Sequence, residues 1–450
     1  MKINLFLNRL VGVFLVSGCG LFSLSITAVE LDSYRAPEFT SDQEMTLRES
    51  VIYAFAHDPT IAQMTAQVSI GQGLIDEAES AWQPQIGLQS GLGGANGNLA
   101  NDDNNYTDKT YGVTLTQLVY DFGKTNNNIL QQKHIKKSYV FALQQTMSDV
   151  AKKTAKTYLL VKRYGVLKKA AEQGVQSLRT VERIAKVRAN SGLSSSADYL
   201  QAQSRIAIMQ SQVEQFFTRQ ETAIAQLVVL TGVRANTYST PPLGLSEQTM
   251  EVSAIDYSAI AAVKRAMAES EAASSVIEKN KAGYLPTIKL EAGRTRYQNK
   301  NDPYWDNQIY LNLDVPLYTG GAVSARVAQA MGAKETAEQG INKVKFDVMT
   351  NASTAYSNYE GSRSNYRVSV RQVEIAERAR AVYLDEYKLS RRSVNDLITV
   401  EQDLYQSHLA LINAEFDGWD AAVDYASAVD NLVDVLDIHT IEDTESLPNI

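Results

Sequence analysis

Short stretches of the chain alternate regularly between apolar and polar residues. In "IYLNLDVPL", residues 309–317, the odd positions are Ile, Leu or Val and the even positions are Tyr, Asn, Asp or Pro. Successive side chains of a strand point to opposite faces, so this period of two predicts strands with one apolar and one polar face. We expect four such strands, at about residues 85–94, 110–119, 286–297 and 307–317.

Two much longer stretches, at about residues 124–190 and 322–390, contain no proline and carry apolar or small residues at three- and four-residue spacing. That spacing predicts amphipathic helices. At about 1.5 Å per residue each helix would extend about 100 Å, which is typical of coiled-coil-like elements and not of a compact domain. A second helix is expected to fold back after each, at about residues 197–230 and 395–432.

The same order of motifs occurs twice. The matched pairs are "WQPQIGLQSG" with "YLPTIKLEAG", "LVYDFGK" with "VPLYTGG", and "GLSSSADYLQAQ" with "RRSVNDLITVEQ". We therefore expect two structural repeats, residues 46–232 and 254–432, joined by a linker at 233–253. Each repeat should open with a helix, and Pro84 and Pro286 should stop these helices where the strands begin, because proline lacks the N–H that a helix needs.

The first 28 residues resemble a secretory signal, because Lys2 and Arg9 accompany an uncharged apolar stretch from Leu10 to Ala28. A membrane-spanning helix is the alternative, but Ser and Gly residues dilute the apolar run. Cys19 lies in "VSGC", which resembles a bacterial lipoprotein cleavage box and makes it a candidate for acylation. The plain signal is favoured, since the apolar run continues beyond this cysteine.

Composition narrows the class of protein. A net charge of −8 without basic clusters argues against nucleic-acid binding. The four histidines lack ligand spacing and no nucleophile accompanies a base, so we expect no enzyme activity, metal or other cofactor. Residues 29–45 are expected to form a linker. The end of the chain, residues 433–450, carries five acids and no base and is expected to be frayed or disordered.

The strands suit a membrane β-barrel, since they are about ten residues long and aromatic residues lie near their ends: Tyr106, Tyr111, Tyr120, Phe122, Tyr304, Trp305 and Tyr318. Four strands cannot close a barrel, and an open edge in lipid leaves backbone groups without hydrogen bonds. Several copies must therefore share one barrel, and three copies would leave a passage. A soluble hairpin lying on a helix layer is the alternative.

The motifs "YDFG" and "YTGG" connect strands to long helices and predict seams where the barrel becomes a helical tunnel. Their residues are Tyr120, Asp121, Phe122 and Gly123 in the first repeat, and Tyr318, Gly320 and Gly321 in the second. Glycine suits a seam because the backbone must turn sharply there.

In this order and spacing, the motifs resemble the TolC family of outer-membrane efflux and secretion ducts, over about residues 47–432. The resemblance rests on "TLRESVIYAFAHDPTI", "AWQPQIGL", "QLVYDFGK", "RANSGLSSSADYLQAQ", "VPLYTGGA" and "NDLITVEQDLY". It implies a fold that is mainly α with membrane β: a homotrimer with a shared twelve-stranded β-barrel and a long α-helical barrel closed at its periplasmic tip.

The resemblance also implies a lock at that tip. Tyr387 matches the lock tyrosine, Arg392 the lock arginine, and Asp198 the aspartate that they engage. Asp396 matches the first acidic residue of the constricting ring, whereas Thr399 replaces the second. An Arg–Asp pair in a narrow, partly dehydrated constriction is stronger than a surface pair. Ordinary solvated charges at the hairpin ends are the alternative interpretation.

The implied function is a passive exit duct in the outer membrane of a Gram-negative bacterium, surrounded by outer-membrane lipid. A periplasmic adaptor would bind the tip, and an inner-membrane ABC or RND transporter would supply the energy. Type I protein secretion and small-molecule drug or metal efflux both remain open, and "QLVYDFGK" with a plain signal favours secretion. A periplasmic coiled-coil adaptor that forms no channel is a more distant alternative.

Overall fold

The computed structural model describes residues 44–96, 105–192, 195–242, 250, 252–298, 303–389 and 391–438. These all belong to one unit, Glu38–Ile450. The signal segment with Cys19 and the last twelve residues lie outside the described part. Among the described residues, no helix has both the length and the apolar character needed to cross a bilayer.

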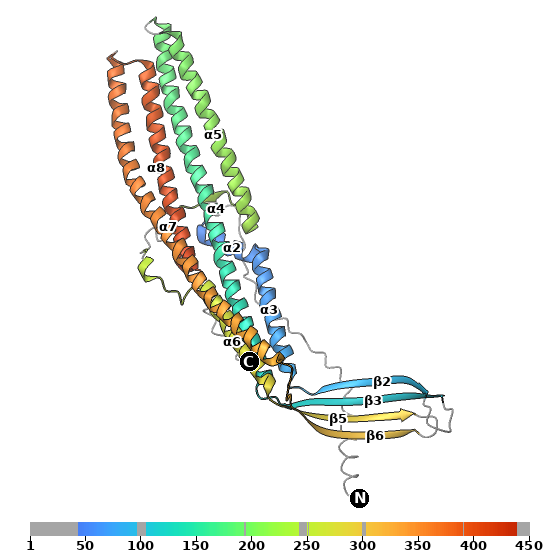
Figure 1. The fold of residues 1–450 in the computed structure, drawn as a ribbon. Coiled ribbons are helices and arrows are strands. Elements are labelled where there is room, and N and C mark those ends of the chain that lie inside the picture. Colours follow the sequence, from blue (N-terminus) through green and yellow to red (C-terminus); the bar gives the residue numbers. More distant parts are fainter. Residues whose placement is uncertain are drawn as a thin grey trace. The chain divides into compact units, whose positions relative to one another are not determined.

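Helices dominate the described chain, with one four-stranded and one two-stranded sheet (Figure 1). In chain order the elements are β1 (Glu44–Met45), α2 (Leu47–His57), α3 (Pro59–Ser80), β2 (Gln85–Asn96), β3 (Asn105–Tyr120), α4 (Lys124–Asn190), α5 (Ser196–Thr231), β4 (Thr237–Tyr238), α6 (Ala261–Lys281), β5 (Thr287–Gln298), β6 (Tyr304–Asp314), α7 (Ala322–Lys388), α8 (Val394–Ala428) and α9 (Leu432–Val435), with 3₁₀ turns at Val252–Ala254 and Ala282–Tyr284.

The first repeat opens with two helices, α2 and α3, and not with the single helix that was predicted. Pro59 breaks the run, because the residue before a proline is pushed out of the helical region. Asp58 accordingly has an extended backbone, and its carboxylate accepts a hydrogen bond from the Thr60 N–H at 2.8 Å. Asp58 and Pro59 thus form the N-cap and first position of a new helix.

The long helices α4 and α7 each contain 67 residues. Each folds back on a second helix, so that α4 with α5 and α7 with α8 form two hairpins (Figure 1). Helix α4 also packs on α8 and α6, which joins the first repeat to the second. The buried side of α4 follows the predicted spacing, with Val161, Leu167, Ala171, Val175 and Leu178 all buried. Many of the buried residues are alanines, which lets the helices approach closely.

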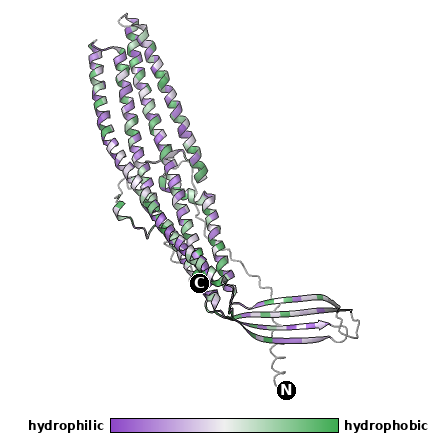
Figure 2. Ribbon diagram, in the orientation of Figure 1, coloured by the Kyte–Doolittle hydropathy of each residue, from purple (hydrophilic) through white to green (hydrophobic). Residues whose placement is uncertain are grey.

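The larger sheet has the strand order β2-β3-β5-β6, and all its pairs are antiparallel. Apolar and polar residues alternate along the strands (Figure 2). The register places the apolar residues opposite one another on a single face, in the pairs Leu88–Val113, Leu115–Ala292, Leu290–Leu311 and Ile288–Leu313. That face is bare in the single chain, since Leu88 is 82% and Leu311 is 68% exposed.

Strand β6 ends at Asp314, three residues before the predicted end. Pro316 accounts for the difference, because it cannot donate a hydrogen bond to a sheet ladder. The apolar residues of "VPLYTGG" therefore lie in the connection to α7, whereas those of "LVYDFGK" belong to β3, which runs to Tyr120. The two seams are similar in sequence but differ in where the strand stops.

Both predicted linkers are partly ordered. The short strands β1 and β4 pair in parallel, with Met45 opposite Tyr238. The Tyr158 hydroxyl, on α4, lies 2.9 Å from the Met45 carbonyl and 2.7 Å from that of Ser239. Burial raises the pKa of Tyr158, which keeps its hydroxyl protonated as a donor. The inter-repeat connection is thereby tied to the middle of α4.

The predicted frayed tail is wrong for residues 433–438. Helix α9 begins at Leu432, and Val433, Leu436 and Ile438 are all buried. They pack with α4 and α8, so their apolar side chains outweigh the acidic character of this segment. The rest of the predicted tail, from residue 439, lies outside the described part.

Asp430 joins three helices at the end of α8. Its backbone has a positive φ of 59°. One carboxylate oxygen accepts a hydrogen bond from the Ser148 hydroxyl on α4, and the other accepts one from the Ala261 N–H at the start of α6, at 2.8 Å. Burial raises the pKa of Asp430, although both hydrogen bonds oppose the shift.

We expect Asp430→Asn to reduce the dependence of stability on pH. A raised carboxyl pKa means that the folded state binds the proton more tightly, so stability falls as pH rises from the ordinary carboxyl range through the folded pKa, and is level above it. Asparagine removes this titration, tolerates a positive φ and can still accept from the Ala261 N–H. The thermal midpoint in detergent between pH 4 and 7 should fall less steeply than in the wild type.

Asp430→Ala serves as the comparison variant. It also removes the titration, but it leaves the Ala261 N–H without a partner and should be less stable than Asp430→Asn by about 1–3 kcal/mol at every pH. An Asp430→Asn protein with the wild-type pH slope would contradict this account of Asp430.

Candidate functional site

The seam of the first repeat connects β3 to α4 through a tight turn of three residues. Phe122 has a φ of 53° and Gly123 a φ of 92°. The Asp121 side chain, 2% exposed, accepts hydrogen bonds from the Gly123 N–H at 3.2 Å and the Thr125 N–H at 2.7 Å. Asp121 therefore caps the first turn of α4 from outside the helix, where backbone donors have no intrahelical partner.

The seam of the second repeat uses two glycines for the same turn. Gly320 and Gly321 have φ values of 63° and 82°. A side chain in this region of φ would be strained, which is the physical reason for glycine here. The seam tyrosines differ in surroundings: Tyr318 is 89% exposed, whereas the Tyr120 ring packs against that of Phe122 with centroids 4.7 Å apart.

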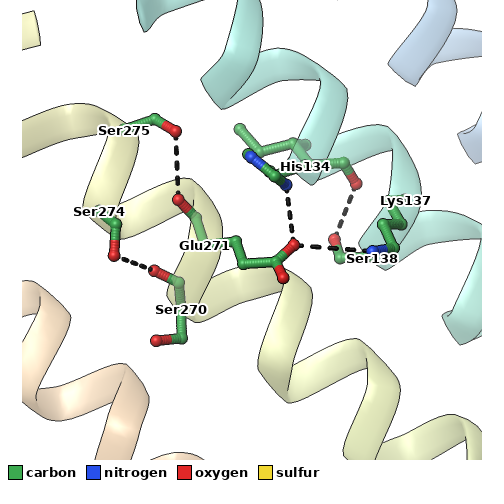
Figure 3. A network of polar contacts seen from close by, with 8 residues as sticks. His134, Lys137, Ser138, Ser270, Glu271, Ser274 and Ser275 are labelled. Atoms are coloured by element: carbon green, nitrogen blue, oxygen red, sulfur yellow. Dashed lines mark hydrogen bonds and ion pairs between the residues drawn. The ribbon is translucent and has the colours of Figure 1, made fainter.

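Beyond the seams, polar contacts connect α4 of the first repeat to α6 of the second. His134 Nδ1 lies 2.9 Å from a Glu271 carboxylate oxygen, and Lys137 Nζ lies 3.7 Å from the same oxygen (Figure 3). Nearer the sheet, Lys279 Nζ on α6 donates to Gln131 Oε1 on α4 at 2.8 Å. Burial, followed by the nearby Lys124, lowers the pKa of Lys279. The two repeats are thus joined by hydrogen bonds as well as by apolar packing.

At the opposite end of the helices, the two hairpins share one apolar core. Its buried members come from all four helices: Ala171, Val175, Leu178, Val181, Ala185, Ala202, Ile206, Met209, Tyr387, Val394, Leu397, Ile398 and Tyr405. The Gln201 side chain on α5 also donates to the Asn395 side chain on α8, at 2.8 Å. The hairpin ends are therefore in contact within one chain.

Tyr387 lies in this core and is only 5% exposed. The guanidinium of Arg188, on α4, lies 5.0 Å from the centre of its ring. Burial raises the pKa of the Tyr387 hydroxyl; Arg188 opposes the rise and the charge of Asp198 adds to it. The hydroxyl has no hydrogen bond of standard geometry among the described residues, despite the closeness of Arg188. The charge of Asp198 thus acts on the Tyr387 hydroxyl, and the lock roles of both residues stay a prediction.

Arg392 lies elsewhere in the single chain. Its Nε is 2.7 Å from a carboxylate oxygen of Glu386, and its guanidinium lies 4.2 Å from the centre of the Tyr383 ring. Both partners belong to the same hairpin as Arg392. Among the residues that the structure describes, no ion pair joins Arg392 to Asp198. The arginine–aspartate part of the lock stays a prediction.

Asp396 has a local structural role. It forms a capping box with Ser393 at the start of α8, in which its carboxylate accepts from the Ser393 N–H and hydroxyl, each at 2.9 Å. These bonds lower the pKa of Asp396. The hydroxyl of Thr399, at the second ring position, donates to the Asn395 carbonyl. A constricting ring needs further copies of the chain, so the ring role of Asp396 stays a prediction.

Arg188 and Glu386 were missed from the sequence. Arg188 is the basic residue in the last turn of α4, within the quoted "RANSGLSSSADYLQAQ" motif, and Glu386 is next to Tyr387. A charged residue within one turn of a hairpin end can be recognised in the sequence as a candidate site residue. Its contact partner cannot, because the partner depends on how the chain folds at the hairpin ends. Among the described residues, no group of three or more His, Cys, Asp or Glu side chains could hold a metal ion.

A four-stranded sheet with a bare apolar face, continued by paired helical hairpins, is typical of an outer-membrane channel protein. The chain belongs to the outer membrane efflux protein family, whose sequence model matches residues 53–233 and 261–423. This confirms the resemblance to the TolC family and the expected fold class. The protein is therefore an outer-membrane channel protein of a Gram-negative bacterium, and not an enzyme.

Individual relatives are distant in sequence. The outer membrane efflux protein BepC of Brucella suis is 22% identical over 383 residues, covering 83% of this chain and 82% of BepC. The alkaline protease secretion protein AprF of Pseudomonas aeruginosa is 24% identical over 252 residues, 52% of each chain. The solved CmeC outer membrane channel of Campylobacter jejuni has a TM-score of 0.74 at 15% identity, covering 86% of this chain and 85% of CmeC.

Proposed function

We propose that three copies of this chain form an exit duct across the outer membrane, with a shared twelve-stranded barrel. The observation that carries the proposal is the four-stranded sheet, whose edge strands β2 and β6 each have one partner. In lipid, an unpaired edge leaves backbone N–H and C=O groups without hydrogen bonds, at several kcal/mol each. Pairing β6 of one copy with β2 of the next removes every edge.

The two faces of the sheet suit opposite sides of a barrel wall. Exposed leucine, isoleucine and valine side chains lie on one face, where lipid would replace water. The other face carries small or polar residues, among them Gln89, Gly112, Thr114, Glu291 and Asn312. A barrel of twelve strands with such an interior would hold water and leave a passage, whereas eight strands would be filled by side chains.

The contacts at the hairpin ends support a gate in which the α7–α8 hairpin moves away from the α4–α5 hairpin. Such a movement separates Tyr387 from Arg188 and Gln201 from Asn395. The Gln201–Asn395 hydrogen bond is exposed and weak, whereas Tyr387 is buried, so opening must also separate apolar side chains of the shared core. Arg392 forms an ion pair with Glu386 in the single chain. In the closed trimer it would lie on the side of the tip where Asp198 is, as the proposed lock requires.

A passive duct needs an external energy source. We propose that a periplasmic adaptor binds the hairpin ends, at about residues 190–196 and 390–395, and connects the duct to an inner-membrane ABC or RND transporter. The efflux and protease-secretion relatives support a place in such an assembly. The alternative of a periplasmic coiled-coil adaptor without lipid-facing strands does not fit the exposed apolar face of the sheet.

We predict that Arg392→Ser combined with Tyr387→Phe raises single-channel conductance in planar bilayers several-fold over the wild type, because it removes the arginine and the tyrosine hydroxyl of the proposed lock. The matched control is Arg391→Ser combined with Tyr405→Phe. Arg391 is the exposed neighbour of Arg392, and Tyr405 is a second buried tyrosine of the same core. The control should keep wild-type conductance. Equal conductance in all three proteins would contradict the lock.

We propose that the cargo is protein and that the duct serves type I secretion. The "QLVYDFGK" seam and the resemblance to AprF support this choice. Small-molecule drug or metal efflux is the second candidate, supported by the resemblance to BepC. Deleting the gene should remove specific proteins from the culture supernatant and leave drug and metal susceptibility unchanged, and the wild-type gene should restore the supernatant proteins. Increased susceptibility with an unaltered supernatant would favour efflux instead.

A further inference from the structure

Three cationic side chains lie on the apolar face of the sheet, at the end farther from the helices. The register pairs Tyr111 with Arg296, and Arg296 with Trp305. Since side chains alternate along a strand, Arg294 and Arg296 share the face of Leu290, and Lys109 shares the face of Tyr111. We call Lys109, Tyr111, Arg294, Arg296 and Trp305 the arginine patch.

Trp305 organises the two arginines of the patch. The Arg294 guanidinium lies 4.4 Å from the centre of the Trp305 ring, and that of Arg296 lies 5.5 Å from it. Stacking on an aromatic ring orients a guanidinium and leaves its N–H groups free to donate to a ligand that lies in the plane of the guanidinium. Trp305 is 50% exposed, and both arginines are exposed. The patch is therefore open to a ligand.

The cations of the patch have no acidic partner in the described chain. Neither arginine nor Lys109 forms an ion pair among the described residues. The nearest acids on β5 and β6, Glu291 and Asp306, fall on the opposite face by the alternation of side chains. Three positive charges thus gather on the face that the proposed barrel turns toward lipid.

The arginine patch lies near the outer edge of the part of the sheet that would span the membrane. Eight residues separate Ile288, near the helix end of β5, from Arg296. At about 3.4 Å per residue this is about 27 Å along the strand, or about 20 Å across the membrane for a tilt near 40°. The apolar band of a barrel is about 25 Å tall. The backbone of Arg296 therefore lies about 5 Å below the outer edge of this band, a gap that a long arginine side chain can span to reach an anionic headgroup.

We propose that the arginine patch binds the phosphorylated headgroup of lipid A, the membrane anchor of outer-leaflet lipopolysaccharide. The guanidinium of arginine can donate two parallel hydrogen bonds to phosphate oxygens, and charged hydrogen bonds of this kind are among the strongest in proteins. Acyl chains of the same lipid would lie along Leu290 and Leu311 on the apolar rows below. The inference rests on the proposed function, because the trimeric barrel turns this face to the outer leaflet.

The test measures binding of lipid A with two phosphates to the detergent-extracted wild-type protein, by native mass spectrometry. The variants are Arg294→Gln, Arg296→Gln and the double substitution. Each lost charge should weaken binding about fivefold, and both should weaken it about 25-fold. The matched control is Lys289→Gln, which removes a positive charge from β5 on the opposite face and should bind as the wild type does.

Two comparison ligands identify the source of the phosphate. Lipid A without phosphates should bind at least tenfold more weakly to the wild type, and inorganic phosphate should compete only weakly. Equal binding of both forms of lipid A, or equal weakening by Lys289→Gln and Arg294→Gln, would overturn the inference. So would full competition by inorganic phosphate.

The mass spectrum of the wild-type protein also separates failure of this inference from failure of the proposed function. Trimers that bind lipid A without regard to the arginines would overturn the lipid site alone. Monomers without trimers would overturn the proposed function, and with it the assignment of this face to the outer leaflet.

Discussion

The structure depends on one constraint: a strand at the edge of a sheet must find a partner wherever water cannot reach it. Strands β2 and β6 each have a neighbour on one side only, and one face of the sheet between them is mainly apolar and exposed. The unpaired edges would be costly in lipid, and the exposed apolar face would be costly in water. Assembly with other copies satisfies both at once, since it closes the ladder of hydrogen bonds and gives the apolar face to the lipid.

In the proposed duct, the helices extend the β-barrel beyond the lipid. Their connection to the strands must turn the backbone within a few residues without leaving helix donors unpaired. The first repeat solves this with the Asp121 carboxylate and the second with Gly320 and Gly321. Farther along, packing between α4, α6, α7 and α8 joins the two repeats. Small buried residues permit this close contact, and groups such as Asp430 and Tyr158 fix the helix order through buried hydrogen bonds.

Regular patterns were the most predictable part of the fold. The long helices could be predicted because a proline-free run with helical spacing has few alternatives, and the strands because their alternation is strict. Breaks were harder. Pro59 interrupts a run whose apolar spacing continues past it, and Pro316 ends β6 within an alternating segment. The buried positions of Val433 and Ile438 could not be read from an acidic segment, because they depend on the surface of α4 and α8.

The candidate site was predictable in its positions but not in its partners. The motifs placed Asp198, Tyr387, Arg392 and Asp396 at the hairpin ends, where they lie in the structure. That Arg188 contacts Tyr387 depends on the packing of two hairpins nearly 200 residues apart in the chain, and that Glu386 binds Arg392 depends on the shape of one hairpin turn; spacing alone specifies neither.

The most direct test of the account is electron microscopy of the detergent-extracted protein, with its mass measured on the same sample. We expect three copies of the chain in a threefold particle, with a stalk of helices below one closed barrel. A folded monomer that stays dispersed in buffer without detergent would contradict the account, because its strand edges and apolar face would then need neither sister copies nor lipid.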